Sequence, residues 1–223
     1  MNRPQLVGLI GILAAGAAVI LALFQPAAFF HAYLFAVLAW LNPALGCLLL
    51  TFIHRMTGGK WGRISQPYLA AGAATLPWAL LFAVPLFFGL NDLFPWDRSN
   101  PSSLLAMHPT YLSPAGYIIR GVLYFLLYLW LIQLTRRRDQ AWTGPVGCIV
   151  FVLTTYLLSV DWVVALEPGW YSTGFPVVLM ASQAVSAMAL SIAAAVWLKG
   201  SERAEEGTRP TWVDLGNLML AAL

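Results

Sequence analysis

Apolar residues follow one another along this chain in six long blocks, and shorter polar segments separate the blocks. Each block holds about 20 mostly apolar residues, the length that an α-helix needs to cross the hydrocarbon of a bilayer. A helix satisfies its backbone hydrogen bonds internally, as a lipid-exposed segment must. We therefore predict six transmembrane helices at about residues 5–24, 32–53, 68–90, 115–135, 143–163 and 175–198.

The first block shares one feature with a secretory signal peptide, because Arg3 comes just before it. The apolar core of a signal peptide is about 7–15 residues long, and a cleavage site of small residues follows it. This block is longer, and the stretch LALFQPAAFF at its end contains no clear site of that kind. We therefore interpret residues 5–24 as a transmembrane helix.

The composition is typical of a protein that lies largely in lipid. Hydrophobic residues make up 60% of the 223 residues, charged residues only 9%, and the mean hydropathy is +0.75. Soluble domains are about 45–50% apolar and about 25% charged. We therefore predict one all-α polytopic membrane domain over residues 1–223. Residues 212–223 resemble the opening of a seventh helix but are too few to span a bilayer.

Basic residues are distributed unevenly between the two ends of the predicted helices. With the amino terminus in the cytoplasm, only Arg98 and Arg120 of the 12 basic residues fall toward the opposite side. Cytoplasmic loops of membrane proteins are enriched in Lys and Arg. We therefore expect both termini to be cytoplasmic. The net charge of +3 follows from this bias and indicates no nucleic-acid partner.

Histidine and cysteine are too few and too scattered to predict a cofactor. Cys47 and Cys148 lie singly in predicted helices, without the spacing of a metal site. His31 and His54 lie about 34 Å apart along one helix, and His108 lies in a loop, so they cannot form the facing pair that a membrane haem needs. No CxxCH motif, cysteine cluster or glycine-rich phosphate loop occurs. We expect no cofactor, metal or catalytic residue in this chain.

Two ionisable residues fall inside the predicted helices at similar depth. Arg120 lies one to two turns into the fourth helix from the non-cytoplasmic side, and Asp161 lies near the same side at the end of the fifth. A charge in the membrane costs several kcal/mol unless it is paired or hydrated. A salt bridge between them is the simplest interpretation, with Asp92, Asp97 and Glu167 as competing partners. The pair could be a latch between two helices or part of a proton relay.

Two further patterns predict contacts. Small residues recur every four positions in the first helix, at residues 14, 18 and 22, and in the sixth, at residues 187, 191 and 195 after Gln183. Such stripes let helices approach closely in lipid. The loop of residues 91–114 carries acids, aromatic residues and prolines, which favours either a docking or gating surface or an interfacial lid.

Large aromatic residues surround the predicted end of the fifth helix, in the stretch SVDWVVALEPGWYSTG. We expect this helix to end near Val163, with Pro168 and Gly169 turning the chain toward the sixth. Aromatic residues are enriched at the level of the lipid headgroups. We therefore predict that Trp162, Trp170 and Tyr171 anchor the two sides of this turn there.

Five segments resemble, in order and spacing, the cofactor-free integral membrane subunit of bacterial alternative complex III, a relative of the quinol-binding subunit of the same complex. This quinol-oxidising respiratory assembly passes electrons through iron–sulfur and multihaem subunits to cytochrome c or a terminal oxidase. The resemblance covers nearly the whole chain from residue 31 onward, and the element SVDW…LEP is its most specific part. The segments are HRMTGGKWG (54–62), TLPWALLF (75–82), GLNDLFPW (89–96), YLSPAGYIIRGVLYFLLYLWL (111–131) and SVDWVVALEPGWYSTGFPVVLMASQAVSA (159–187).

The resemblance implies a non-redox integral membrane subunit in a bacterial inner membrane, which anchors the complex and has proton conduction as an open second role. Haem c and iron–sulfur clusters would belong to its partners, a multihaem cytochrome c and an iron–sulfur subunit. The quinol site would lie in the quinol-binding membrane subunit, so no quinone ligand is expected here. Lipids and a terminal oxidase are further expected partners. Asp92, Asp97, Asp161 and Glu167 match positions in the family's motifs and would serve in proton release or a relay.

The chain departs from this family in length, because members are typically about twice as long. The resemblance implies two helical bundles, of which helices two to five would form one complete four-helix bundle. This sequence would then be a short or split form, or part of a longer chain. A membrane scaffold or assembly protein stays open as an alternative function. A secondary transporter is a further alternative, although transporters often contain an internal repeat and the two halves here show no convincing similarity.

Overall fold

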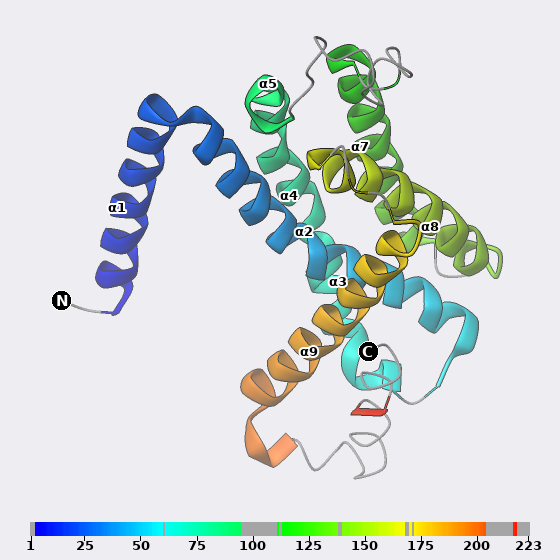
Figure 1. Cartoon of the computed structure of the whole chain (residues 1–223). Helices are drawn as coiled ribbons and strands as arrows, with labels where there is room; N and C mark the ends of the chain where they lie inside the picture. Colours follow the sequence, from blue (N-terminus) through cyan, green and yellow to red (C-terminus); the bar gives the residue numbers. More distant parts are fainter. Residues whose placement is uncertain are drawn as a thin grey trace.

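The computed structural model describes residues 3–59, 61–94, 111, 113–137, 140–167, 170, 172–203 and 216–217. The described residues form helices and no strand (Figure 1). Six of the helical segments are long and apolar enough to cross a membrane, which confirms the predicted all-α polytopic class. Of the expected seventh helix, residues 212–223, all but 216–217 lie outside the described residues. The helices are α1 (Arg3–Phe24), α2 (Pro26–Thr57), α3 (Trp61–Ala74), α4 (Leu76–Ala83), η1 (Val84–Phe88), α5 (Leu90–Leu93), α7 (Pro114–Arg136), α8 (Thr143–Trp162), η2 (Val164–Leu166) and α9 (Phe175–Arg203).

The second span is longer than its apolar block predicts. Helix α2 has 32 residues, with a proline in its first turn and Gly58 after its end at a positive φ of 65°. Proline suits the first turn because its missing N–H would have no helical partner there, and glycine tolerates positive φ without strain. A helix of this length extends about 48 Å, which exceeds a hydrocarbon core of about 30 Å. Helix α2 therefore has to tilt in a bilayer or project beyond it.

The third span, the apolar stretch Ser65–Phe88, is broken into most of α3, all of α4 and all of η1. Pro77 lies in the first turn of α4 and Pro85 in the first turn of η1. Proline removes a backbone donor and clashes with the preceding turn, so a continuous helix is interrupted at both places. The amide of Thr75 instead bonds the carbonyl of Gly72, at 3.1 Å, in a tighter turn.

Helix α2 is the centre of the packing. The third span and α8 pack along it, while α7 packs mainly on α8 and meets α2 to a smaller extent. Helix α9 extends this group, because its contact with α2 is the most extensive between any two described helices. The two backbones meet where Gly46 of α2 faces Gln183 and Ala187 of α9, and a Cβ built on Gly46 would lie 1.9 Å from the Gln183 carbonyl oxygen. Only glycine permits this approach.

The small-residue stripe of the sixth span packs as predicted, because Ala187, Ser191 and Ala195 are buried. The stripe of the first span does not pack to the same extent. Helix α1 stands apart from the other helices and meets them only where it turns into α2 (Figure 1). None of its 18-residue apolar window is buried within the chain. The surface of α1 is therefore available to lipid or to another protein.

Arg55, near the end of α2, joins α2 to the facing ends of α7 and α8. Its Nη1 donates to the carbonyl of Leu134 at 3.2 Å and to Oγ1 of Thr143 at 2.9 Å, and its Nη2 donates to the carbonyl of Thr135. The last carbonyls of a helix have no partner within it and carry partial negative charge. From the sequence, Arg55 is only one part of the charge bias, whereas in the fold it also caps α7.

We predict that Gly46→Ala lowers the stability of the protein, because the added methyl group would collide with the backbone of α9. Overpacking of this kind typically costs about 1–3 kcal/mol. Gly16→Ala is the matched control, since nothing lies within 4 Å of a Cβ added there. Thermal unfolding of the two variants in detergent measures the difference. Equal melting temperatures for Gly46→Ala and the unaltered protein would contradict the close α2–α9 contact.

Candidate functional site

Asp161 is a charged residue buried in a largely apolar core. It lies in the last turn of α8 and is 2% exposed. The carboxyl end of a helix carries partial negative charge, which disfavours a carboxylate there. Burial adds a large desolvation cost unless the charge is paired and hydrogen-bonded. The neighbours of Asp161 must therefore offset both effects.

Arg120 of α7 supplies the counter-charge. Its Nε donates to Oδ2 of Asp161 at 2.8 Å, and its Nη2 donates to Oδ1 at 3.1 Å. This two-point geometry fixes the orientation of both side chains and is stronger than a contact between neutral groups. The pair that the sequence predicted is therefore present, and it joins α7 to α8. The Arg120 side chain is 18% exposed, so one side of the pair approaches the molecular surface.

Two tyrosines complete the shell around the carboxylate. Tyr124 lies one helical turn after Arg120, and its hydroxyl donates to Oδ2 of Asp161 at 2.7 Å. Tyr111, which precedes α7, donates its hydroxyl to Oδ1 at 3.0 Å. Asp161 thus receives two hydrogen bonds at each oxygen, four in all. Ionised carboxylates accept about four hydrogen bonds at most, so this one is saturated.

Tyr111 also holds Arg120 directly. Its backbone carbonyl accepts a hydrogen bond from Nη1 of Arg120 at 2.7 Å, and the guanidinium carbon lies 3.8 Å from the centroid of its ring. Burial, followed by the negative charge of Asp161, raises the pKa of the Tyr111 phenol above its ordinary value. A raised pKa keeps the phenol protonated, and so a donor, through neutral pH. Tyr111 therefore fastens the chain before α7 to both charges.

Aromatic rings pack beside this cluster. Trp162, the neighbour of Asp161, is fully buried, and its ring lies 5.9 Å from that of Phe125, 6.2 Å from that of Tyr117 and 6.3 Å from that of Phe87. The prediction that Trp162 anchors the turn at the headgroups is therefore wrong. The side chain of Trp162 faces α7 and the third span. Packing against the aromatic rings there buries its large apolar surface within the protein. Trp170 is exposed as expected, and Tyr171 lies outside the described residues.

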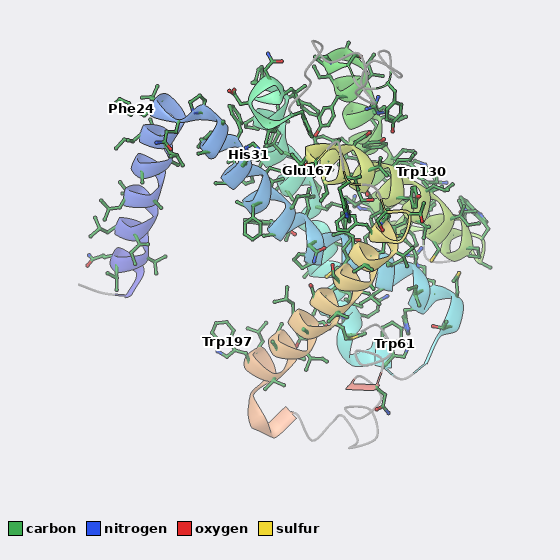
Figure 2. The ribbon with its side chains drawn as sticks, viewed as in Figure 1. Phe24, His31, Trp61, Trp130, Glu167 and Trp197 are labelled. Carbon is green, nitrogen blue, oxygen red and sulfur yellow. The ribbon has the colours of Figure 1, made fainter. Side chains whose placement is uncertain are left out.

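The other predicted acids do not join the cluster. Asp92 lies in α5 and is partly exposed, and Glu167 follows η2 and is exposed (Figure 2). Neither forms an ion pair with another described residue. Asp97 falls in the segment that the structure leaves undescribed, as do His108 and most of the predicted loop of residues 91–114. Of the four candidates that the structure describes, it brings together Arg120 and Asp161 only.

Neither tyrosine of the cluster was predicted from the sequence. The spacing between Arg120 and Tyr124 could have suggested Tyr124, because residues four apart share one face of a helix. Tyr111 had no such signal, since only the fold brings it to Asp161. A second polar pair lies one turn farther along α7, where the hydroxyl groups of Tyr128 and Thr155 are 2.9 Å apart. No hydrogen bond between described residues links the two pairs.

The geometry suits a structural ion pair better than a reactive site. Every Asp161 oxygen already accepts two donors, which leaves no free ligand position for a metal. Among the described residues, no group of three His, Cys, Asp or Glu lies close enough together to hold a metal ion. His31 and His54 both belong to α2, where their separation along one helix prevents a shared haem. The expectation that this chain holds no cofactor stays a prediction.

Comparison with known proteins adds no name to this site, because no protein-family model and no curated protein matches the chain.

We predict that Asp161→Asn destabilises the protein by an amount on the order of a few kcal/mol, because it leaves Arg120 without its counter-charge. Asparagine keeps the shape of the side chain but can no longer accept from all four donors. Glu167→Gln makes the same chemical change on an exposed side chain and should alter stability by about 0.5 kcal/mol or less. Thermal unfolding in detergent compares the two variants. Unchanged stability of Asp161→Asn would show that the ion pair is not a latch.

Proposed function

We propose that this chain is a non-redox integral membrane subunit of a quinol-oxidising respiratory complex of the alternative complex III type, which it anchors in a bacterial inner membrane. The proposal rests on the five segments that resemble the cofactor-free membrane subunit of that complex. One structural observation supports it. Tyr111, Arg120 and Tyr124 come from one of these segments and Asp161 from another, and the four residues form a single cluster. Two of the five segments, including the one with the most specific resemblance, thus meet at the buried charge of Asp161.

A subunit role agrees with how the described part of the chain uses its polar groups. The acid at the centre of the cluster is saturated by donors, so it has no capacity to bind a substrate. Helix α1 exposes apolar surface along its length, including Ile12 at 71% and Leu23 at 75%. Such a surface suits either lipid or the transmembrane helices of partners. The proposed partners are a quinol-binding membrane subunit, a multihaem cytochrome c and an iron–sulfur subunit, with a terminal oxidase as an electron acceptor.

Within this role we assign the Arg120–Asp161 pair as a latch that holds α7, α8 and the chain around Tyr111 together. A proton relay is the second candidate, and one observation favours it. The hydroxyl pair of Tyr128 and Thr155 continues the line of polar groups along α7 beyond Tyr124. A relay predicts that Asp161→Asn leaves an assembled complex with normal haem content but slower proton release. A latch predicts poorer assembly.

The proposed orientation places both termini in the cytoplasm, because ten of the 12 basic residues then lie on that side. The turn between η2 and α9 would face the periplasm. The turn between α2 and α3 would face the cytoplasm. These two turns offer the exposed residues Glu167 and Thr57 as reporters.

We expect Glu167→Cys to react with a membrane-impermeant maleimide in intact spheroplasts, and Thr57→Cys to react only after the membrane is permeabilised. Both variants are made in a chain in which Cys47 and Cys148 are replaced by alanine, which removes background labelling. The unsubstituted cysteine-free chain is the control. Labelling of Thr57→Cys in intact spheroplasts, with Glu167→Cys protected, would reverse the proposed topology.

Co-purification tests the proposed assembly directly. The affinity-tagged chain, extracted from native membranes in mild detergent, should carry partners with a haem c absorbance spectrum. The chain separated from those partners should have no haem absorbance and no iron. A transporter would instead be recovered alone or as a homo-oligomer, and an assembly factor would be absent from the mature complex. Stoichiometric haem bound to the separated chain would contradict the non-redox assignment.

A further inference from the structure

An open groove of about 830 Å³ lies between α2, α3 and α9. Ala36, Trp40 and Cys47 line it from α2, Tyr68 and Gly72 from α3, and Leu198 from α9. Its volume falls within the range of about 300–1,000 Å³ that small-molecule sites occupy. All three helices belong to spans that are apolar enough to cross a membrane, which would place the groove at the level of the hydrocarbon in a bilayer.

The lining is suited to hydrocarbon and unsuited to water. Among the described residues that line the groove none is charged, and most of the lining side chains are apolar. Two of its hydroxyl groups are already occupied, because Thr75 Oγ1 donates to the carbonyl of Gly72 at 2.7 Å and Ser191 Oγ donates to that of Met188 at 2.8 Å. A buried water molecule needs roughly two to four polar partners, and an apolar hollow therefore does not hold a water molecule. The bilayer itself is the nearest source of hydrocarbon to fill this space.

The length of the groove matches one leaflet. From Ala36 to Cys47 the groove follows α2 for about 16 Å at the rise of an α-helix, which is about half of a hydrocarbon core of roughly 30 Å. A partner's transmembrane helix crosses both leaflets and would use a longer face. A second hollow of about 200 Å³, lined in part by Tyr33 and Phe82, continues beyond Trp40 and is much smaller. An acyl chain from one leaflet therefore fits the larger hollow better than a helix does.

Basic residues cluster in the sequence at the end of the groove marked by Tyr68 and Leu198. Lys199 directly follows Leu198 in α9, and Arg203 lies one turn farther, with Glu202 between them. Arg63 lies in the first turn of α3, ahead of Tyr68. Three cations and one acid therefore lie near this end of the two helices. Basic residues beside gaps between transmembrane helices attract anionic headgroups.

We propose that this groove binds an acyl chain of an anionic phospholipid, with the headgroup beside Lys199. The small side chains of α3 and α9 create the hollow, and the basic residues that lie nearby in the sequence favour a negatively charged headgroup. Trp197, which precedes this end, extends from α9 into the surroundings and is 87% exposed (Figure 2). The site is separate from the Arg120–Asp161 cluster, which lies between α7 and α8.

Photo-crosslinking in native membrane vesicles tests this site with the full chain and any partners present. The probe is phosphatidylglycerol with a diazirine in its acyl chain. Phosphatidylcholine with the same diazirine-bearing acyl chain is the control lipid without net charge. We expect crosslinks on the groove residues of α3 and α9 to exceed those on α1, and phosphatidylglycerol to exceed phosphatidylcholine several-fold. Ala194→Phe, which fills the groove, should reduce these crosslinks several-fold. Ala193→Phe, on the exposed side of α9, should not.

Lys199→Gln provides an independent variant that leaves the apolar lining intact. It should reduce the preference for phosphatidylglycerol over phosphatidylcholine while retaining crosslinks in the groove. Equal labelling of the groove and α1 would mean that the groove contacts only bulk lipid, and would overturn the proposal. A groove that is unlabelled in vesicles but crosslinks to a second copy or to a partner helix would overturn it as well. Loss of labelling in both Ala193→Phe and Ala194→Phe would also count against it.

Discussion

A carboxylate that is removed from water must find all of its hydrogen bonds within the protein, and Asp161 obtains them from donors in two other parts of the chain. Arg120 and Tyr124 come from α7, Tyr111 comes from the segment before it, and Asp161 itself ends α8. Helix α7 places two of the donor side chains, the segment before it places the third, and α8 places the acceptor, so the cluster forms only when all three parts are in position. The polar group that is most costly to bury thereby specifies how α7 and α8 meet.

Apart from the hydrogen bonds of Arg55 at the ends of α7 and α8, association of the described helices depends largely on shape. Lipid is as apolar as the side chains that it surrounds, so burial alone gives little preference for one helix pairing over another. Close approach provides that preference at Gly46, where α9 reaches the backbone of α2, and at Gly147, which faces the ring of Phe52. The fold thus combines the Arg120–Asp161 cluster with several tight contacts between small residues and large neighbours. The groove beside α3 arises where small residues face one another and no large side chain fills the space.

The spans could be predicted closely from sequence, because an apolar block of about 20 residues has few alternatives in a bilayer. The Arg120–Asp161 pair was also predictable, since two opposite charges at one depth each need a partner. Side-chain direction at the helix end was not predictable in the same way. Trp162, next to Asp161, is of a residue type that is common at the membrane interface. It nevertheless lies in the core, because the rotation of α8 about its axis directs this side chain inward. Tyr111 was missed for a related reason, as its contact depends on how the chain enters α7.

The contact between Gly46 and Gln183 joins residues that are 137 positions apart in the sequence (183 − 46). Synthesis proceeds at about 5–20 residues per second, so roughly 7–27 s separate the translation of these two residues. During that interval α2 is already made while the helix that covers it does not yet exist. The surface of α2 at Gly46 must then be covered by lipid or by the insertion machinery. Helix α9 has to displace that lipid or machinery when it packs there. A late step in the biogenesis of this protein is therefore the replacement of temporary contacts on α2, one of the first helices to be made, by contacts with α9.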